Sequence, residues 1–270
     1  TAGAQGGDGT WDHLGNTNWW DGATNVQWNN ASGDDAEFRD GPGTVTLGSD
    51  VSANKVTFDD PYTITGPFTL TVGGSGLRAT PGSGNHRIEA NVLIGAGQTW
   101  QLQGGGNVEV TGNVSGSSNW TRNGVATLTL SGDNSGYSGT FTIGQGTVAI
   151  NSNTAFGSGT FSFRGASGTV QAVGADRVIG NALSLFIGNN STQTNTFGGT
   201  HDLTFTSDLT LTGGLSGSTG TWNMVVAERT TTFSGAISET QQTKRVIKDG
   251  PGTLVFGGDN SYAGTTTVQD

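Results

Sequence analysis

Two acidic stretches near the start of the chain hold the residues best able to do chemistry. Residues 34–37 carry three carboxylates (Asp34, Asp35 and Glu37) just before Arg39, and Asp59 is followed by Asp60. Carboxylates that bind calcium beside an Arg or Lys that removes a proton are what a lyase acting on an acidic polysaccharide needs. Aspartates at strand ends also cap turns through hydrogen bonds to the backbone. No basic residue has a position specific enough to be the catalyst, so we favour the turn-capping interpretation.

Other catalytic and metal-binding patterns do not occur in the sequence. His13, His86 and His201 are far apart, and none has the spacing of a metal-binding pair. The chain has no cysteine, and no G-x-S-x-G segment with a companion acid and histidine suggests a serine nucleophile. The string Gly144-Gln-Gly146 lies between expected strands and opens no helix, which argues against a phosphate cradle. The sequence therefore predicts no metal, no cofactor and no enzyme activity.

Charge and composition limit the partners that the chain can have. A net charge of −10 argues against binding to nucleic acid or to anionic membranes, because both need clustered Lys and Arg. No run of about 18 apolar residues predicts a membrane-spanning helix. The absence of cysteine and the abundance of Thr, Ser, Asn and Gly are compatible with an extracellular bacterial protein.

The charge is unevenly distributed along the chain. Most of the acidic excess lies in residues 1–60, whereas Lys244, Arg245 and Lys248 make the region before residue 249 locally basic. One interpretation is solvated charge that aids solubility. The other is a pair of complementary ends that meet head to tail.

Alternation of apolar and polar residues with a period of two dominates the sequence and predicts short, half-buried strands. Glycine-rich clusters separate these strands and act as corners, because glycine adopts positive φ at little cost. The strands expected on this pattern are residues 44–47, 55–58, 62–64, 68–72, 107–110, 127–130, 140–143, 160–163, 202–205, 208–211, 253–256 and 265–268.

A repeat decides between the architectures that short strands allow. Residues 123–143 and 249–268 both read as a strand, a turn written Gly-Asp-Asn-Ser, and a second strand. Self-similarity of this kind is typical of a solenoid, in which each coil buries its inward row only against its neighbours. With about 20 to 25 residues per coil, we expect roughly eleven or twelve coils and a rod about 50 to 60 Å long.

The first 40 residues differ from the rest because they contain Trp11, Trp19, Trp20 and Trp28. An open solenoid end needs a bulky cover, so we predict a cap over residues 1–40 and one continuous solenoid over residues 41–270. Alternatively, Trp19, Trp20 and Trp28 form a platform on which sugar rings stack. No comparable aromatic cluster occurs near residue 270. We expect that end to be covered by another molecule or by further coils of a longer protein.

The repeat resembles the autotransporter-associated β-strand repeat proteins, a family of bacterial surface proteins. The matching text is Gly-Thr-Leu-Val-Phe-Gly-Gly-Asp-Asn-Ser-Tyr-Ala-Gly-Thr-Thr-Thr-Val at residues 252–268, with looser copies at 126–143 and in the segment that follows it to residue 150. The resemblance implies a right-handed parallel β-helix in a secreted or surface-exposed passenger with an adhesive or structural role. It supplies no catalytic residues.

Three functions are open on this basis. The first is a non-enzymatic structural β-solenoid, a subunit of a surface fibre, stalk or biofilm matrix that associates head to tail with copies of itself. The second is an adhesin passenger that binds glycans, such as an extracellular polysaccharide, or a host surface through Trp19, Trp20 and Trp28. The third is the lyase. The residues that we expect at the head-to-tail contact are Lys244, Arg245, Lys248, Thr265, Thr267, Val268, Asp34 and Asp35.

Overall fold

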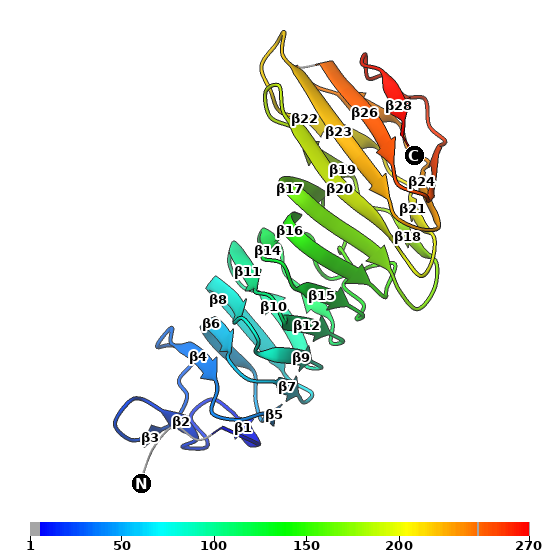
Figure 1. The fold of residues 1–270 in the computed structure, drawn as a ribbon. Helices are drawn as coiled ribbons and strands as arrows, with labels where there is room; N and C mark the ends of the chain where they lie inside the picture. Colours follow the sequence, from blue (N-terminus) through cyan, green and yellow to red (C-terminus); the bar gives the residue numbers. More distant parts are fainter. Residues whose placement is uncertain (1–5, 242, 270) are drawn as a thin grey trace.

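The chain folds into a parallel β-solenoid, as the repeat predicts. The computed structural model describes residues 6–241 and 243–269. These residues form strands and turns without a helix, stacked into about 11 turns. Figure 1 shows an elongated rod with the N-terminus at one end and the C-terminus at the other. Within these residues, no helix is long or apolar enough to span a membrane.

Each coil passes through three columns of parallel strands, which we call faces I, II and III. Face I contains β4 (Asp35–Phe38), β6 (Val51–Phe58), β8 (Thr69–Ala79), β11 (Gln98–Leu102), β14 (Trp120–Asn123), β16 (Phe141–Ile150), β17 (Phe161–Ala172), β19 (Leu183–Phe186), β22 (Leu209–Thr212) and β25 (Ile237–Glu239).

Face II contains β1 (Gly9–Trp11), β5 (Gly43–Leu47), β7 (Tyr62–Thr65), β9 (Gly84–Ile88), β12 (Gly106–Val110), β15 (Thr127–Leu130), the second halves of β16 and β17, β20 (Thr192–Gly199), β23 (Thr219–Val226), β26 (Thr243–Asp249) and β28 (Thr266–Val268). Face III begins with the first halves of β6 and β8, followed by β10 (Asn91–Ile94) and β13 (Val114–Ser115), and ends with β18 (Arg177–Ile179), β21 (Leu203–Phe205), β24 (Thr230–Phe233) and β27 (Thr253–Phe256).

The coil changes length along the rod. In the middle of the chain a residue pairs with one about 20 positions on, as Phe141 does with Phe161. This separation grows to 28 positions between Leu209 and Ile237 and returns to 20 between Val246 and Thr266 in the last coil. At about 4.8 Å per coil, ten steps from the first coil to the last give a rod about 50 Å long.

Each strand expected from the period-two pattern overlaps an observed strand, but β6, β8, β16 and β17 extend well beyond the expected bounds. One difference concerns Gly144–Gly146, which the sequence places between strands and the structure places inside β16. The ladder between β16 and β17 continues past this point through a shift of register between Ile143 and Gln145. Gly144 and Gly146 therefore mark an irregularity within the paired strand β16, and they do not mark the end of a strand.

Inward-facing residues form one continuous apolar core. Leu128, Leu130, Val148 and Ile150 are fully buried on successive coils of face II. Aromatic rings also stack from coil to coil. The centroids of Phe205 and Phe233, which are register partners on neighbouring coils, lie 4.9 Å apart. Phe156 and Phe161, five residues apart in the chain, also stack, with centroids 4.1 Å apart and nearly parallel planes.

The N-terminal region combines a cap with the first coil. A short antiparallel hairpin, β2 (Trp19–Trp20) with β3 (Asn25–Val26), projects from it. The solenoid begins earlier than residue 41, because β4 already pairs in parallel with β6 from Asp35 to Phe38. The boundary drawn from tryptophan content is therefore too late, since residues of the first coil contribute to the cap.

The two copies of the repeat occupy different faces. In the first copy, β15 lies on face II between β12 and β16. In the second copy, the matching strand β27 lies on face III beside β24. The turn asparagine keeps its role in both copies. Asn134 Oδ1 accepts a hydrogen bond from the Val114 backbone N–H, and Asn260 Oδ1 accepts one from the Ile237 N–H, each over 2.8 Å.

Candidate functional site

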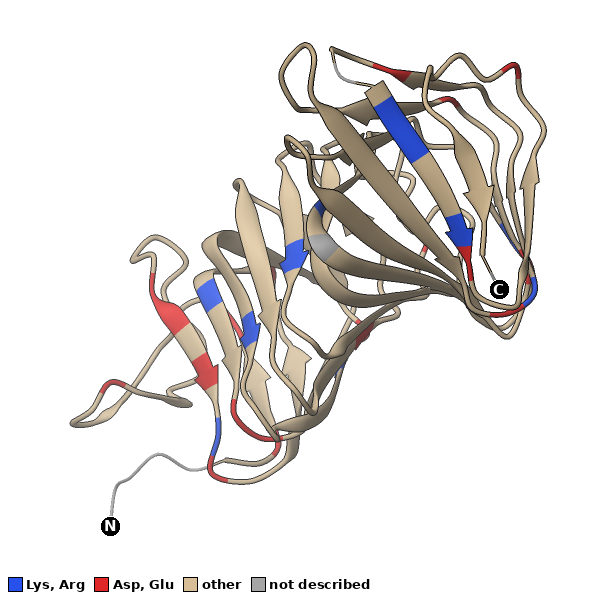
Figure 2. Ribbon diagram, turned by 45° about the horizontal axis from the view of Figure 1, so that its top comes forward, with Lys and Arg blue, Asp and Glu red and all other residues tan. Residues whose placement is uncertain are grey.

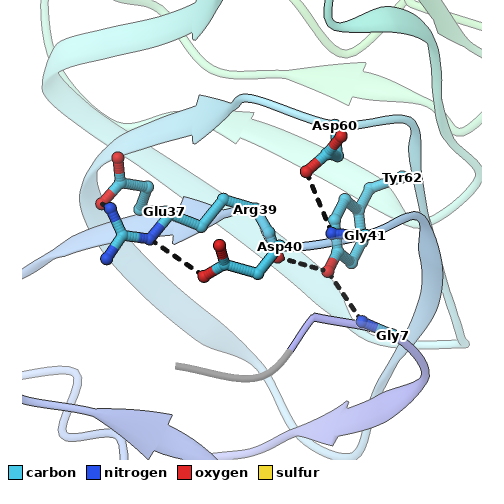
Figure 3. Close-up of polar contacts among 7 residues, drawn as sticks. All are labelled: Gly7, Glu37, Arg39, Asp40, Gly41, Asp60 and Tyr62. Atoms are coloured by element: carbon cyan, nitrogen blue, oxygen red, sulfur yellow. Dashed lines mark hydrogen bonds and ion pairs between the residues drawn. The ribbon is translucent and has the colours of Figure 1, made fainter. Parts of the chain in front are cut away.

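The acidic stretches identified in the sequence lie together at the N-terminal end of the rod (Figure 3). Arg39 is the centre of the group, with its guanidinium 3.6 Å from a Glu37 carboxylate oxygen and 3.4 Å from one of Asp40. All three side chains are about half exposed, so these ion pairs contribute little to stability. Arg39 is engaged by neighbouring carboxylates, which does not suit a proton-abstracting base.

Asp60 and Tyr62 hold the backbone at this corner. Asp60 Oδ2 accepts a hydrogen bond from the Gly41 N–H over 3.0 Å. The Tyr62 hydroxyl accepts from the Gly7 N–H at 2.9 Å and donates to the Arg39 carbonyl at 3.2 Å, as Figure 3 shows. Burial raises the pKa of Tyr62. With its hydrogen bond to Gly41, Asp60 has the turn-capping role that we favour for the acidic residues.

The Glu37 carboxyl has a raised pKa. Burial raises the pKa of Glu37, a hydrogen bond with the Asp59 side chain raises it further, and the positive charge of Arg39 opposes both. Among residues 6–241 and 243–269, no three His, Cys, Asp or Glu side chains come together in a way that could hold a metal ion. Glu37 and Asp59 can share a proton at this corner. Within the described residues, however, the corner lacks the cluster of carboxylates that would bind calcium for an elimination reaction.

His86, one of the three separate histidines, lies in the core. Its ring stacks on Phe58 with centroids 4.5 Å apart, and Nε2 lies 2.9 Å from the Ser83 hydroxyl. The Ser83 hydroxyl also donates to the Thr80 carbonyl at 2.8 Å, so it accepts from His86 and its proton is not available to the ring. Burial lowers the pKa of His86 to about 4. The pair is a packed core contact and lacks the geometry of an activated nucleophile.

The buried imidazole predicts a loss of stability in mild acid. An unfolded histidine titrates near 6.5 whereas the folded one titrates at about 4, so the unfolded chain binds an extra proton between these values. Stability from His86 is complete above pH 6.5 and falls as pH drops toward 4, by about 2 kcal/mol at pH 5. The measurement is urea unfolding from pH 7.5 to 5, comparing the parent with His86→Gln, which should show the shallower pH dependence. His13→Gln, which removes an exposed histidine, is the control; an equal flattening there would contradict the assignment to His86.

The tryptophans of the first 40 residues form an aromatic cluster at the N-terminal end. The Trp11 ring lies 5.0 Å from Trp19, 5.1 Å from Trp28 and 5.6 Å from Phe38, and Trp11 is fully buried. Trp28 is 4% exposed, and its Nε1 donates to the Ser52 carbonyl of the next coil at 3.1 Å. The cluster closes the core as the cap prediction expects. Of the three residues proposed as a sugar platform, Trp28 is buried and Trp19 and Trp20 are half-buried.

Lys244 is the clearest correction among the residues expected at the head-to-tail contact. It points into the core with no exposed surface, and its Nζ donates to the carbonyls of Gly213 at 2.6 Å, Thr212 at 3.3 Å and Ile187 at 3.4 Å. Burial lowers the pKa of Lys244, and Glu239 opposes this. The reason is alternation: Lys244 lies two positions before buried Val246 on β26 and so shares its inward direction.

The other expected contact residues lie at the two ends of the rod. Arg245, Thr265, Thr267 and Val268 are exposed on the last two coils, while Lys248 is half-buried beside them. Asp34 and Asp35 are exposed at the first coil. Figure 2 shows acidic residues on β4 and basic residues on β26, near opposite ends. The structure therefore keeps the two groups apart, and only contact between two molecules could bring them together.

A further set of surface residues was not foreseen from the sequence. We call it the face I row: the outward-facing residues of face I from β6 to β22. The lack of acidic residues in this row becomes apparent only when the coils are stacked, because members on successive coils are about 20 or more positions apart in the chain. The members are Lys55, Thr57, Gly76, Arg78, Thr99, Gln101, Thr121, Asn123, Thr142, Gly144, Ser162, Arg164, Ser184, Phe186, Thr210 and Thr212.

The fold and the ends together define the protein as a capped parallel β-solenoid. The passenger-associated-transport-repeat model matches residues 121–150 and 246–270, the two places where the strand–turn–strand text occurs. The resemblance to autotransporter-associated repeats is thereby confirmed over these two segments. Comparison with proteins of curated function found no match, and comparison with solved structures found none either.

Proposed function

We propose that the chain is a non-enzymatic structural solenoid of a secreted or surface-exposed passenger, and that it associates head to tail through its last coil. Passenger-type repeats and a β-solenoid support the coarser part of this proposal. The finer part rests on the comparison of the two repeat copies.

The proposal depends on a difference between the two repeat copies. The first strand of the repeat pairs with strands on both of its edges in one copy and, within the described residues, on one edge in the other. β15 lies between β12 and β16, and its Leu128 and Leu130 are fully buried. Within the described part of the chain, the matching strand β27 pairs only with β24, and its Leu254 and Phe256 are half-buried. A strand with a free edge and a partly exposed apolar row is a template for another strand.

We further propose that a second copy covers this edge. The exposed Asp34 and Asp35 of its first coil complement the exposed Arg245, and a contact between two different ends does not close on itself. Such a contact yields open filaments, the geometry of a fibre or stalk. The same end could otherwise be extended by further coils, in which case purified copies of this chain would stay separate.

The test places a negative charge on the last coil, where it would oppose Asp34 and Asp35 of the second copy. Val268→Asp changes a residue that is 69% exposed at the end of the rod, and Val178→Asp changes one that is 46% exposed on the side. In sedimentation and electron microscopy over a concentration series, we expect the parent to form rods longer than the roughly 50 Å unit. Val268→Asp should shorten them and Val178→Asp should not. Single units at every concentration, or equal effects of the two aspartates, would contradict head-to-tail association.

A further inference from the structure

The face I row has a charge pattern opposite to that of the whole chain. The chain carries a net charge of −10, yet from β6 to β22 the row contains Lys55, Arg78 and Arg164 and no aspartate or glutamate. Among the described residues from β4 to β22, acids appear on this face only at its N-terminal end, where Asp35 and Glu37 of β4 lie beside Lys55 and Thr57. Arg78 and Arg164 are both exposed. They lie four coils apart, from β8 to β17, which is roughly 20 Å along the rod. A cationic strip within an acidic molecule attracts anions to one face.

The surface of face I is hollowed next to Arg164, whereas Arg78 lies on the same face outside the lining of the hollows. Two adjoining hollows share Asn119 and Thr121; one extends to Ser75 on β8 and the other to Ser162 and Arg164 on β17. Together they form a groove that crosses the strands and runs along the rod. Its lining consists of hydroxyl, amide and glycine backbone groups together with Arg164. Hydroxyls and amides both donate and accept hydrogen bonds, as the hydroxyl groups of sugars require.

At one end of the groove a cation and an aromatic ring are held together. The Arg164 guanidinium lies 5.6 Å from the centroid of Phe186 on the next coil. Phe186 is 42% exposed, which is unusual for a phenylalanine in this chain. The contact orients the guanidinium over the row, and the free part of the ring offers an apolar surface for the C–H face of a sugar.

From these features we infer that the face I row is a binding groove for a linear acidic polysaccharide that lies along the rod axis. Arg78 and Arg164 pair with carboxylates of the polymer, and the intervening Thr and Asn side chains bind its hydroxyl groups. Successive coils present similar groups about every 4.8 Å, so the groove matches an extended polymer better than a single small molecule. The inference does not depend on head-to-tail association, because the row lies on the side of the rod.

The experiment measures binding of oligogalacturonate, an acidic glycan, and of a maltooligosaccharide of equal length, a neutral one, by titration calorimetry at low and moderate salt. We expect the acidic glycan to bind at least about tenfold more tightly, with the difference reduced by salt. The double variant Arg78→Gln, Arg164→Gln should weaken binding of the acidic glycan about tenfold or more while leaving the melting temperature unchanged.

Two matched controls separate this groove from charge in general. Arg87→Gln removes the same charge from face II, where Arg87 pairs with Glu89 at 2.9 Å and Glu109 at 3.1 Å, and should leave glycan affinity unchanged. Thr121→Val in the groove should weaken binding, whereas Thr129→Val on face II should not. No binding of oligogalacturonate, or an equal loss in the controls, overturns the inference. Equal affinity for polyphosphate with the same arginine dependence would replace it with a nonspecific anion site.

Discussion

Replacing Trp11 with alanine is expected to lower the free energy of unfolding by about 3–5 kcal/mol. The indole is fully buried and contacts Trp19, Trp28 and Phe38, so its removal leaves a cavity in the cover of the first coil. Because each coil of a solenoid is stabilised by its neighbours, the loss should appear first as fraying at this end. Circular dichroism during urea unfolding and limited proteolysis followed by mass spectrometry measure both effects.

Trp20→Ala is the matched control for this prediction. Trp20 lies next to Trp19 on β2, but its ring is half-buried, so we expect a smaller cost of about 1 kcal/mol. Measuring glycan binding with the same variants separates the cap from the sugar platform. Unchanged stability in Trp11→Ala would show that the aromatic cluster does not close the solenoid, and loss of glycan binding in Trp20→Ala at full stability would favour the platform.

The substitution Gly132→Ala should cost about 3 kcal/mol, because the corner of one coil rests directly on the backbone of the previous coil. A Cβ at Gly132 would lie 2.1 Å from the Gly112 carbonyl oxygen, and one at Gly112 would lie 2.0 Å from that of Ala90. A backbone oxygen cannot move aside without separating the coils. We expect a melting temperature lower by roughly 5–10 °C, measured by scanning calorimetry.

Gly97→Ala provides the comparison, since a Cβ there meets no atom within 4 Å. That substitution should change the melting temperature little, because a compatible Gly-to-Ala exchange mainly reduces the entropy of the unfolded chain. The corresponding glycine of the second copy, Gly258, would place a Cβ 2.3 Å from the Gly235 carbonyl oxygen. Gly258→Ala should therefore destabilise too. Equal melting temperatures for Gly132→Ala and Gly97→Ala would refute the close-stacking explanation.

Much of the fold could be predicted from the sequence because its signals are local. Alternation identified the strands, and the Gly-Asp-Asn-Ser turn identified the repeat unit. The structure supplies the physical basis of that turn: Gly132 fits against the previous coil, and Asn134 accepts a hydrogen bond from the Val114 N–H. The tryptophan cluster was likewise predicted to be a cap, since an open solenoid core needs a bulky cover.

The candidate sites were harder to predict because they depend on which coils lie side by side. Lys244 was expected at an exposed contact although it alternates with Val246, and the same pattern places Arg122 two positions after buried Trp120 on β14. Arg122 is fully buried, its Nη1 donates to the carbonyls of Gly124 and Gln145, and burial lowers its pKa to about 10. Period-two alternation was the available signal for both residues, and for Lys244 the charge outweighed it in the sequence interpretation.

The sequence by itself determined that this chain is a stack of short strands with an aromatic cover at one end, because alternation and repeated turns act within a few residues. Only the tertiary structure decided which face each strand occupies. Coil length varies from about 20 to about 28 residues, so the same repeat text begins on face II in one copy and on face III in the other. The alignment of Arg78 with Arg164 across four coils depends on the summed lengths of the intervening corners, which no local pattern encodes.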